Sequence, residues 1–314
     1  MSTRGGEFDL VIRGGLIIDG SGAPGYRGDV AVVGDRVVVV GEVEGRGRDE
    51  IDADGQVVAP GFVDAHTHMD AQVFWDDLGQ SPCWHGVTTV VMGNCGFTLA
   101  PSRPGEEGMV VRNLERAEDI AAEAMAEGIA WTWSTFPEYL DAVDAAPKGL
   151  NYAASIGHSA LRTWAMGERA FEETATEDDL TLMAGELRAA LRAGAVGFTT
   201  SRSAAHATSD DRPVASRLAS WDEVVALVDV VADERDCVFQ LAPERRRDPR
   251  LLADYEARSA SWPSRVASPS RSATTRPTSC RNPRSRTSRR PWRSVAKCTC
   301  WPTAGPGWAR RSRS

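Results

Sequence analysis

Short apolar runs separated by glycine-containing turns dominate the first 61 residues of the chain. Valine and isoleucine fill these runs, and β-branched side chains suit the pleated surface of a strand. The pairs Gly14-Gly15 and Gly34-Asp35 are turn signals between runs. The pattern predicts strands at 7–13, 16–20, 29–34, 36–41 and 56–61. We interpret residues 1–58 as a small antiparallel β unit that forms part of a β-sandwich.

A helical pattern alternates with further apolar runs in residues 59–256. The segment 177–193 repeats apolar residues at helical spacing, at Leu180, Met183, Leu187 and Leu191. Thr176 and Asp179 resemble a capping box before this helix, and Gly194 ends it. Ser220 caps a second helix, whose predicted core face is Val224, Leu227, Val228 and Val231.

The strands predicted between these helices lie near 57–64, 87–92, 151–156, 195–200 and 237–241. Strands that alternate with helices indicate parallel β–α units and an α/β fold. A closed (β/α)₈ barrel needs eight such strands. The sequence therefore predicts an incomplete (β/α)₈ barrel of about five strands over residues 59–256.

The composition changes abruptly near residue 257. Residues 1–256 hold 22 Lys and Arg and all 44 Asp and Glu, whereas residues 257–314 hold 14 Lys and Arg and no acid. The net charge of −8 is thus the sum of a body at −22 and a tail at +14. The tail has no Leu, Ile, Phe or Met, and this predicts disorder. An out-of-frame translation, a linker and a functional basic arm remain alternative origins, and the abrupt change favours the first.

The charge, the apolar runs and the cysteine count also indicate which partners and which location to expect. A basic tail can bind nucleic acid, but the strongly acidic body repels phosphates, so a nucleic-acid partner is not expected. No apolar run approaches the roughly 20 residues that span a bilayer. The N-terminal segment MSTRGGEFDLVIRGG lacks the apolar core of a secretory signal, which predicts a cytoplasmic protein. Six cysteines in a chain of this length do not indicate a disulfide scaffold.

The candidate chemistry lies where the first two barrel strands are expected to end. His66 and His68 share one face of an extended segment because their spacing is two residues. Cys95 lies in the turn Gly-Asn-Cys-Gly that follows the run 87–92. Imidazole nitrogens and a thiolate suit zinc. Taken singly, an H-x-H pair is more often structural and a lone cysteine more often a small buried apolar residue.

Longer motifs carry a specific resemblance: FDLVIRGGLIIDGSGAPG (8–25), APGFVDAHTHMDAQVFWDD (59–77), HGVTTVVMGNCGFTLAP (85–101), WTWSTFPEYLDAVD (131–144), IGHSALR (156–162) and GAVGFTTS (194–201). With them the sequence resembles the D-aminoacylase (N-acyl-D-amino-acid deacylase) family of the amidohydrolase superfamily. The resemblance implies a (β/α)₈ barrel beside a small β-sandwich. It also implies zinc-dependent hydrolysis of the amide bond in a small-molecule N-acyl-D-amino acid.

The resemblance also implies roles for single residues. His66 and His68 match the metal-binding pair, and Cys95 matches a further metal ligand. His158 and Arg162, in the GHSALR motif, match positions expected to contact substrate or transition state. We also consider His206 as a substitute ligand or substrate contact, the alternative being an exposed loop histidine.

Two departures from the family put activity in doubt. The fifth strand reads FQLAPE, with Gln240 where a metal-binding histidine is expected, and the sixth strand is absent. The catalytic Asp, the general base, is expected beyond residue 257, where the chain has no acid, so the catalytic residue is unknown. We therefore predict a metal-dependent deacylase-like hydrolase, truncated or frameshifted after about residue 257 and inactive as it stands. The alternatives are a non-catalytic, degenerate relative and nucleic-acid binding through the tail.

Overall fold

A computed structural model describes residues 7–116, 119–234 and 237–242 of the chain. Contacts divide these residues into two compact units, 7–61 and 62–242. The predicted boundary was residue 58, and the first unit continues to Gly61. The tail predicted to be disordered, 257–314, lies outside the described residues.

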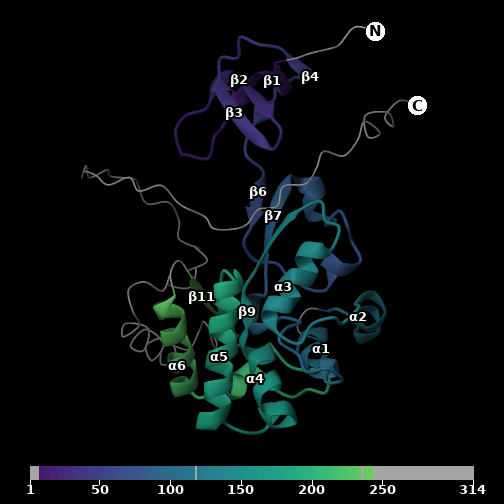
Figure 1. The fold of residues 1–314 in the computed structure, drawn as a ribbon, viewed down its shortest axis with the longest axis vertical. Helices are drawn as coiled ribbons and strands as arrows, with labels where there is room; N and C mark the ends of the chain where they lie inside the picture. The colour runs from purple at the N-terminus through teal and green to yellow at the C-terminus, as the bar shows by residue number, and fades with distance from the viewer. Residues whose placement is uncertain (1–6, 117–118, 235–236, 243–314) are drawn as a thin grey trace, which may run out of the picture. The chain divides into compact units, whose positions relative to one another are not determined.

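The first unit is a mixed β-sheet (Figure 1). Its strands are β1 (Phe8–Ile17), β2 (Tyr26–Val33), β3 (Arg36–Gly41), β4 (Gly47–Asp52) and β5 (Val57–Val58). The order is β3-β2-β1-β4, and β5 also pairs with β1. The pairs β1–β2 and β2–β3 are antiparallel, but β4 and β5 run parallel to β1. The prediction of an antiparallel unit is thus wrong, because β4 and β5 pair in parallel with β1. The sequence of β4, GRDEID, is polar, so the apolar pattern predicted no strand there.

A β-bulge joins the runs 7–13 and 16–20, which the sequence pattern separated, into the single strand β1. The register of β1 against β2 shifts between Ile12 and Gly15. Gly14 has a φ of 68°, a conformation that glycine adopts without strain. Asp29 on β2 accepts the Gly14 N–H at 2.8 Å. The Gly-Gly pair therefore marks a bulge inside a strand and not a turn between strands.

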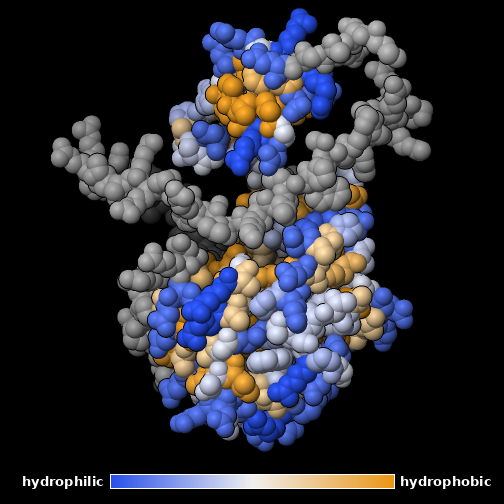
Figure 2. Space-filling view, in the orientation of Figure 1, coloured by the Kyte–Doolittle hydropathy of each residue, from blue (hydrophilic) through white to orange (hydrophobic). Residues whose placement is uncertain are grey.

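The apolar interior of this sheet is small. Val11, Ala31 and Val43 form its buried cluster, with Phe8 and Val39 packed against them. Many other apolar side chains of the unit stay on the surface, and Figure 2 shows apolar surface on this unit. The exposed set comprises Leu16, Ile18, Tyr26, Val33, Val37, Val38, Val40, Ile51 and Val57.

The second unit is built on parallel strands. These are β6 (Phe62–Asp64), β7 (Val87–Met92), β8 (Asn151–Ala154), β9 (Ile156–Gly157), β10 (Gly197–Ser201) and β11 (Val238–Ala242). They form the sheets β6-β7-β8 and β9-β10-β11, and only Ser155 separates β8 from β9. Four of the five predicted barrel strands correspond to β7, β8–β9, β10 and β11. The fifth, 57–64, is two strands, because β5 belongs to the N-terminal sheet and β6 to this one.

Helices follow the strands in sequence, which confirms an α/β fold (Figure 1). They are α1 (Glu107–Glu115), α2 (Ala122–Gly128), α3 (Phe136–Ala145), α4 (His158–Met166), α5 (Glu177–Ala193) and α6 (Trp221–Asp233). Thr176 and Asp179 form the predicted capping box of α5. Ser220 caps α6 by accepting the Glu223 N–H at 3.1 Å. Among the helices described, none combines the length and apolar character needed to cross a membrane.

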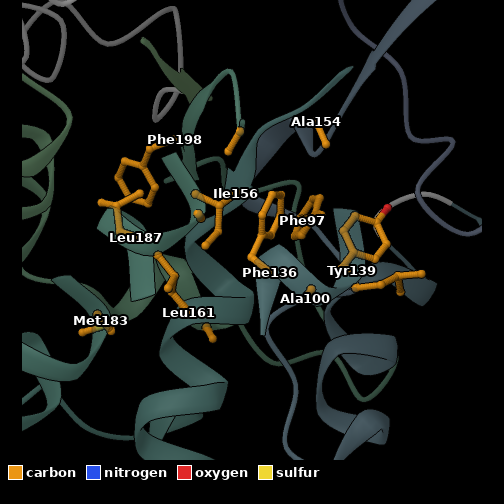
Figure 3. Close-up of a cluster of buried hydrophobic side chains, with 14 of the residues drawn as sticks. Phe97, Ala100, Phe136, Tyr139, Ala154, Ile156, Leu161, Met183, Leu187 and Phe198 are labelled. Carbon is orange, nitrogen blue, oxygen red and sulfur yellow. The ribbon is translucent and has the colours of Figure 1, made fainter. Parts of the chain in front are cut away.

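One large apolar core holds this unit together (Figure 3). Met183 and Leu187 of α5 pack in the same cluster as Phe198 of β10 and Leu161 of α4. The predicted core face of α6, Val224, Leu227, Val228 and Val231, is buried in full. Helical periodicity thus predicted the apolar helix faces that pack in the core with the strands. The candidate site lies at the ends of these strands.

Candidate metal centre

His66, His68 and Cys95 converge just beyond the carboxyl ends of β6 and β7. Their candidate ligand atoms all lie within 4.8 Å of one another, and His66 Nε2 is 3.4 Å from Cys95 Sγ. Bonds of about 2.3 Å to sulfur and about 2.0 Å to nitrogen place two ligands of one tetrahedral zinc roughly 3.3–3.6 Å apart. The donor types and the His66–Cys95 spacing fit a zinc ion, with small movements needed for the widest pair.

The backbone around Cys95 is fixed by close packing. Cys95 has a φ of 56°, in the left-handed region that a residue with a Cβ rarely adopts. Gly93 has a φ of 77°, and a Cβ there would lie 2.0 Å from the Ser155 carbonyl oxygen. Thr199 ties both ends of the turn, since its hydroxyl donates to Gly93 O and accepts from Gly96 N–H. The turn thus holds the thiol in one place at the strand end.

Asp64 and Asp70, which flank the histidines, contact the backbone of the site. Asp64 accepts the His66 N–H at 3.2 Å. Asp70 is fully buried and accepts the Gly93 N–H at 3.1 Å. Burial raises the pKa of Asp70 to about 7 and lowers the pKa of His68 to about 3. His68 is therefore neutral near pH 7, the form in which a histidine can bind a metal.

His206 lies near the two candidate metal-binding histidines, on the loop after β10. Its ring packs on Phe97, with centroids 5.1 Å apart, and Phe97 also packs against His68 at 6.3 Å. Burial, and then the charges of Arg217 and His66, lower the pKa of His206. Ser201 Oγ is 2.7 Å from His206 Nδ1 and accepts the Ser203 N–H. Because a hydroxyl can donate one hydrogen bond and accept two, Ser201 can pair with either tautomer of His206, and it is the Nδ1 side of the ring that faces Ser201.

His158 and Arg162, which were predicted to contact substrate or transition state, lie in the protein interior. Both side chains are fully buried and meet Glu223 of α6, not the metal-site histidines. His158 lies between Thr200 Oγ1 at 2.8 Å and Glu223 Oε1 at 2.9 Å. Arg162 donates to Glu223 at 2.6 Å and to the Glu173 carbonyl at 2.7 Å. Protein groups thus enclose and bind both side chains, and their predicted contact with substrate or transition state stays a prediction.

Buried His158 predicts a dependence of stability on pH. Burial lowers its pKa below the ordinary value of 6.5, although its hydrogen bond to Glu223 opposes this. The unfolded chain therefore binds a proton that the folded chain excludes. We expect the free energy of unfolding to be fully retained above about pH 6.5 and to fall as the pH drops below that value. Urea unfolding at a series of pH values measures this slope.

Two variants separate this effect from general acid denaturation. His158→Gln should flatten the slope below about pH 6.5. His85→Gln, at an exposed position, should leave it unchanged. Equal slopes in all three proteins would show that His158 is not the responsible group.

Gln240 of β11 is the site residue whose role the sequence did not reveal. Its amide oxygen accepts the Cys95 N–H at 3.0 Å, and its amide nitrogen is 3.3 Å from His66 Nδ1. The sequence analysis noted Gln240 only because a histidine was expected there. Its contacts depend on the parallel pairing of β10 with β11, which sets Gln240 beside Thr199.

A model of the amidohydrolase family matches residues 49–234. The chain belongs to the amidohydrolase family. Among its relatives, D-aminoacylase of Alcaligenes xylosoxydans xylosoxydans is 36% identical over 209 residues, which cover 65% of this chain and 40% of that protein. N-acyl-D-glutamate deacylase of the same organism is 37% identical over 196 residues, 62% of this chain and 37% of that protein. This amidohydrolase chain thus spans about 40% of the length of these curated relatives.

Solved structures agree with the sequence relatives. A crystal structure of D-aminoacylase matches with a TM-score of 0.59 and 30% identity, over 81% of this chain and 57% of that one. N-acyl-D-glutamate deacylase from Bordetella bronchiseptica, complexed with zinc and a phosphonate mimic of the tetrahedral intermediate, matches with a TM-score of 0.61 and 29% identity, over 81% of this chain and 56% of that one. The resemblance to D-aminoacylases inferred from the motifs is confirmed.

Proposed function

We propose that this amidohydrolase chain carries the zinc-binding part of a hydrolase that cleaves the amide bond of small N-acyl-D-amino acids. The convergence of His66, His68 and Cys95 at one end of the parallel strands carries the proposal. Relatives named as D-aminoacylase and N-acyl-D-glutamate deacylase, one of them solved with zinc, support the reaction class. We further propose that the parallel strands form part of a (β/α)₈ barrel, that the N-terminal sheet is part of a β-sandwich, and that the protein is cytoplasmic.

The residues of the site divide the chemistry between them. His66, His68 and Cys95 would hold zinc, which when bound supplies Lewis acidity toward a carbonyl oxygen and toward water. His206, whose Nδ1 faces Ser201, would contact a substrate oxygen through Nε2. The general base expected beyond residue 257 has no counterpart in residues 257–314, which contain no Asp or Glu. The three candidate ligands thus support metal binding by this chain, and no residue is assigned as the general base.

This division predicts zinc binding without catalysis. We expect the purified 314-residue chain to bind zinc at one site, measured by titration calorimetry after removal of metal by a chelator. Incubation of the zinc-loaded chain with N-acetyl-D-glutamate or N-acetyl-D-methionine should release no free amino acid, with the L enantiomers as controls. Absence of zinc binding would overturn the proposed function, and turnover of the D substrates would overturn the predicted inactivity.

A further inference from the structure

The side chain of Gln240 joins two of the three candidate zinc ligands. Its Oε1 accepts the backbone N–H of Cys95 at 3.0 Å. Its Nε2 lies 2.8 Å from Asn94 Oδ1 and 3.3 Å from His66 Nδ1. The amide therefore contacts the ring of one ligand and the backbone of another, from a strand that is remote in sequence.

The orientation of this amide is determined by its neighbours. A backbone N–H can only donate, so the Cys95 N–H requires the Gln240 oxygen on its side. Asn94 Nδ2 donates to the carbonyl oxygens of Thr67 and Val91, at 3.0 and 2.9 Å. Carbonyl oxygens only accept, so the Asn94 amide cannot be turned either, and its Oδ1 faces Gln240. Both contacts direct the Gln240 NH₂ group toward Asn94 and His66.

The tautomer of His66 follows from this orientation. Its Nδ1 faces a donor and must accept, so a ring that carries one proton has it on Nε2. His66 Nε2 lies 3.4 Å from Cys95 Sγ, so its N–H is directed at the sulfur. A metal-binding histidine has the opposite arrangement, because it binds through a lone pair and donates its other N–H to an acceptor.

We propose that Gln240 sets the metal affinity of this centre by holding His66 in the tautomer that bonds Cys95 instead of a metal. The proposal rests on the proposed zinc site and makes Gln240 a positioning residue that acts through His66. To bind zinc through Nε2, His66 loses the proton there to solvent and takes one up at Nδ1, and the Cys95 thiol releases its proton to solvent. The Nδ1–H then faces the Gln240 NH₂, so the contact at 3.3 Å is lost. The loss of this contact lowers the affinity of the site for zinc.

Replacing the amide by a carboxylate tests this account. In Gln240→Glu one oxygen can accept the Cys95 N–H and the other can accept His66 Nδ1–H, which leaves the Nε2 lone pair for a metal. We expect zinc to bind about 10–100-fold more tightly to Gln240→Glu than to the unmodified chain, the range typical of residues that orient a metal ligand. Gln56→Glu, in the N-terminal sheet unit, adds the same charge and should leave the affinity unchanged.

Nitrogen NMR of the metal-free proteins tests the tautomer without any metal or activity. The ¹⁵N shifts of His66, assigned by comparison with His66→Gln, should show the proton on Nε2 in the unmodified chain and on Nδ1 in Gln240→Glu. A proton on Nδ1 in the unmodified chain would overturn the proposal even if the variant proved unstable. Equal zinc affinity of the two proteins would overturn it as well, while leaving the zinc site in place. Failure of both proteins to bind zinc would overturn the zinc site and the role of Gln240 together.

Discussion

Replacing Cys95 by glycine is expected to abolish tight metal binding while the second unit stays folded. The variant removes the only thiol among the three candidate ligands, and two imidazoles alone do not make a structural or catalytic zinc set. Left-handed backbone at Cys95, with φ of 56°, is a conformation that glycine adopts freely. Relief of about 1–2 kcal/mol of backbone strain therefore offsets part of the packing lost with the side chain. Binding should weaken at least about 100-fold, since losing a ligand exceeds the effect of losing a supporting contact.

Cobalt(II) provides a direct measurement, because a thiolate ligand gives an intense ultraviolet charge-transfer band. The unmodified chain should show this band and Cys95→Gly should lack it, with zinc calorimetry confirming the loss. Cys83→Ser is the matched control, since Cys83 packs in a separate small cluster around Met69 and Val90. Retention of the band in Cys95→Gly, or its loss in Cys83→Ser, would show that the thiolate ligand is not Cys95.

Much of the fold could be predicted because its signals are local. The apolar face of α6 and the capping box of α5 each depend on residues within a few positions of one another. The bulge in β1 could not be predicted, since Gly14-Gly15 is compatible with a turn or a bulge and only pairing with β2 decides between them. The polar sequence of β4 has no alternation of apolar residues that would predict a strand. This segment is a strand because it pairs with β1.

The candidate metal ligands could be predicted for a similar reason. The spacing of His66 and His68 is local, and the turn that carries Cys95 directly follows an apolar strand. Long-range contacts define the rest of the site. Gln240 is 145 residues from Cys95, so no sequence pattern shows that its amide oxygen accepts the Cys95 N–H.

The GHSALR motif shows most clearly what could not be predicted from the sequence alone. The resemblance implied a substrate or transition-state contact for its His158 and Arg162. Burial of both His158 and Arg162 becomes possible only because Glu223, from a helix 61 residues beyond Arg162, supplies the counter-charge. The resemblance identified the motif, whereas the burial of its His158 and Arg162 depends on Glu223, which the motif does not contain.

Replacing Arg162 by methionine is expected to destabilise the protein strongly. Arg162 has no exposed surface and Glu223 is 4% exposed, so the variant leaves a buried carboxylate without its ion pair. Removing one partner of a buried pair typically costs about 3–5 kcal/mol. Methionine keeps most of the side-chain volume, so the loss reports the charge and not a cavity. Urea unfolding of the full chain at neutral pH measures the change in free energy.

A double-mutant cycle distinguishes this mechanism from simple loss of packing. In Arg162→Met combined with Glu223→Gln, the buried site is neutral, and the new amide oxygen can still accept from His158 Nε2. The double variant should therefore be more stable than Arg162→Met alone, because the buried unpaired charge has been removed. Arg192→Ala, which breaks an exposed pair with Glu234, should cost less than about 1 kcal/mol. If the losses at Arg162 and Glu223 were additive, the two residues would be independent core positions, and the GHSALR motif would need another explanation.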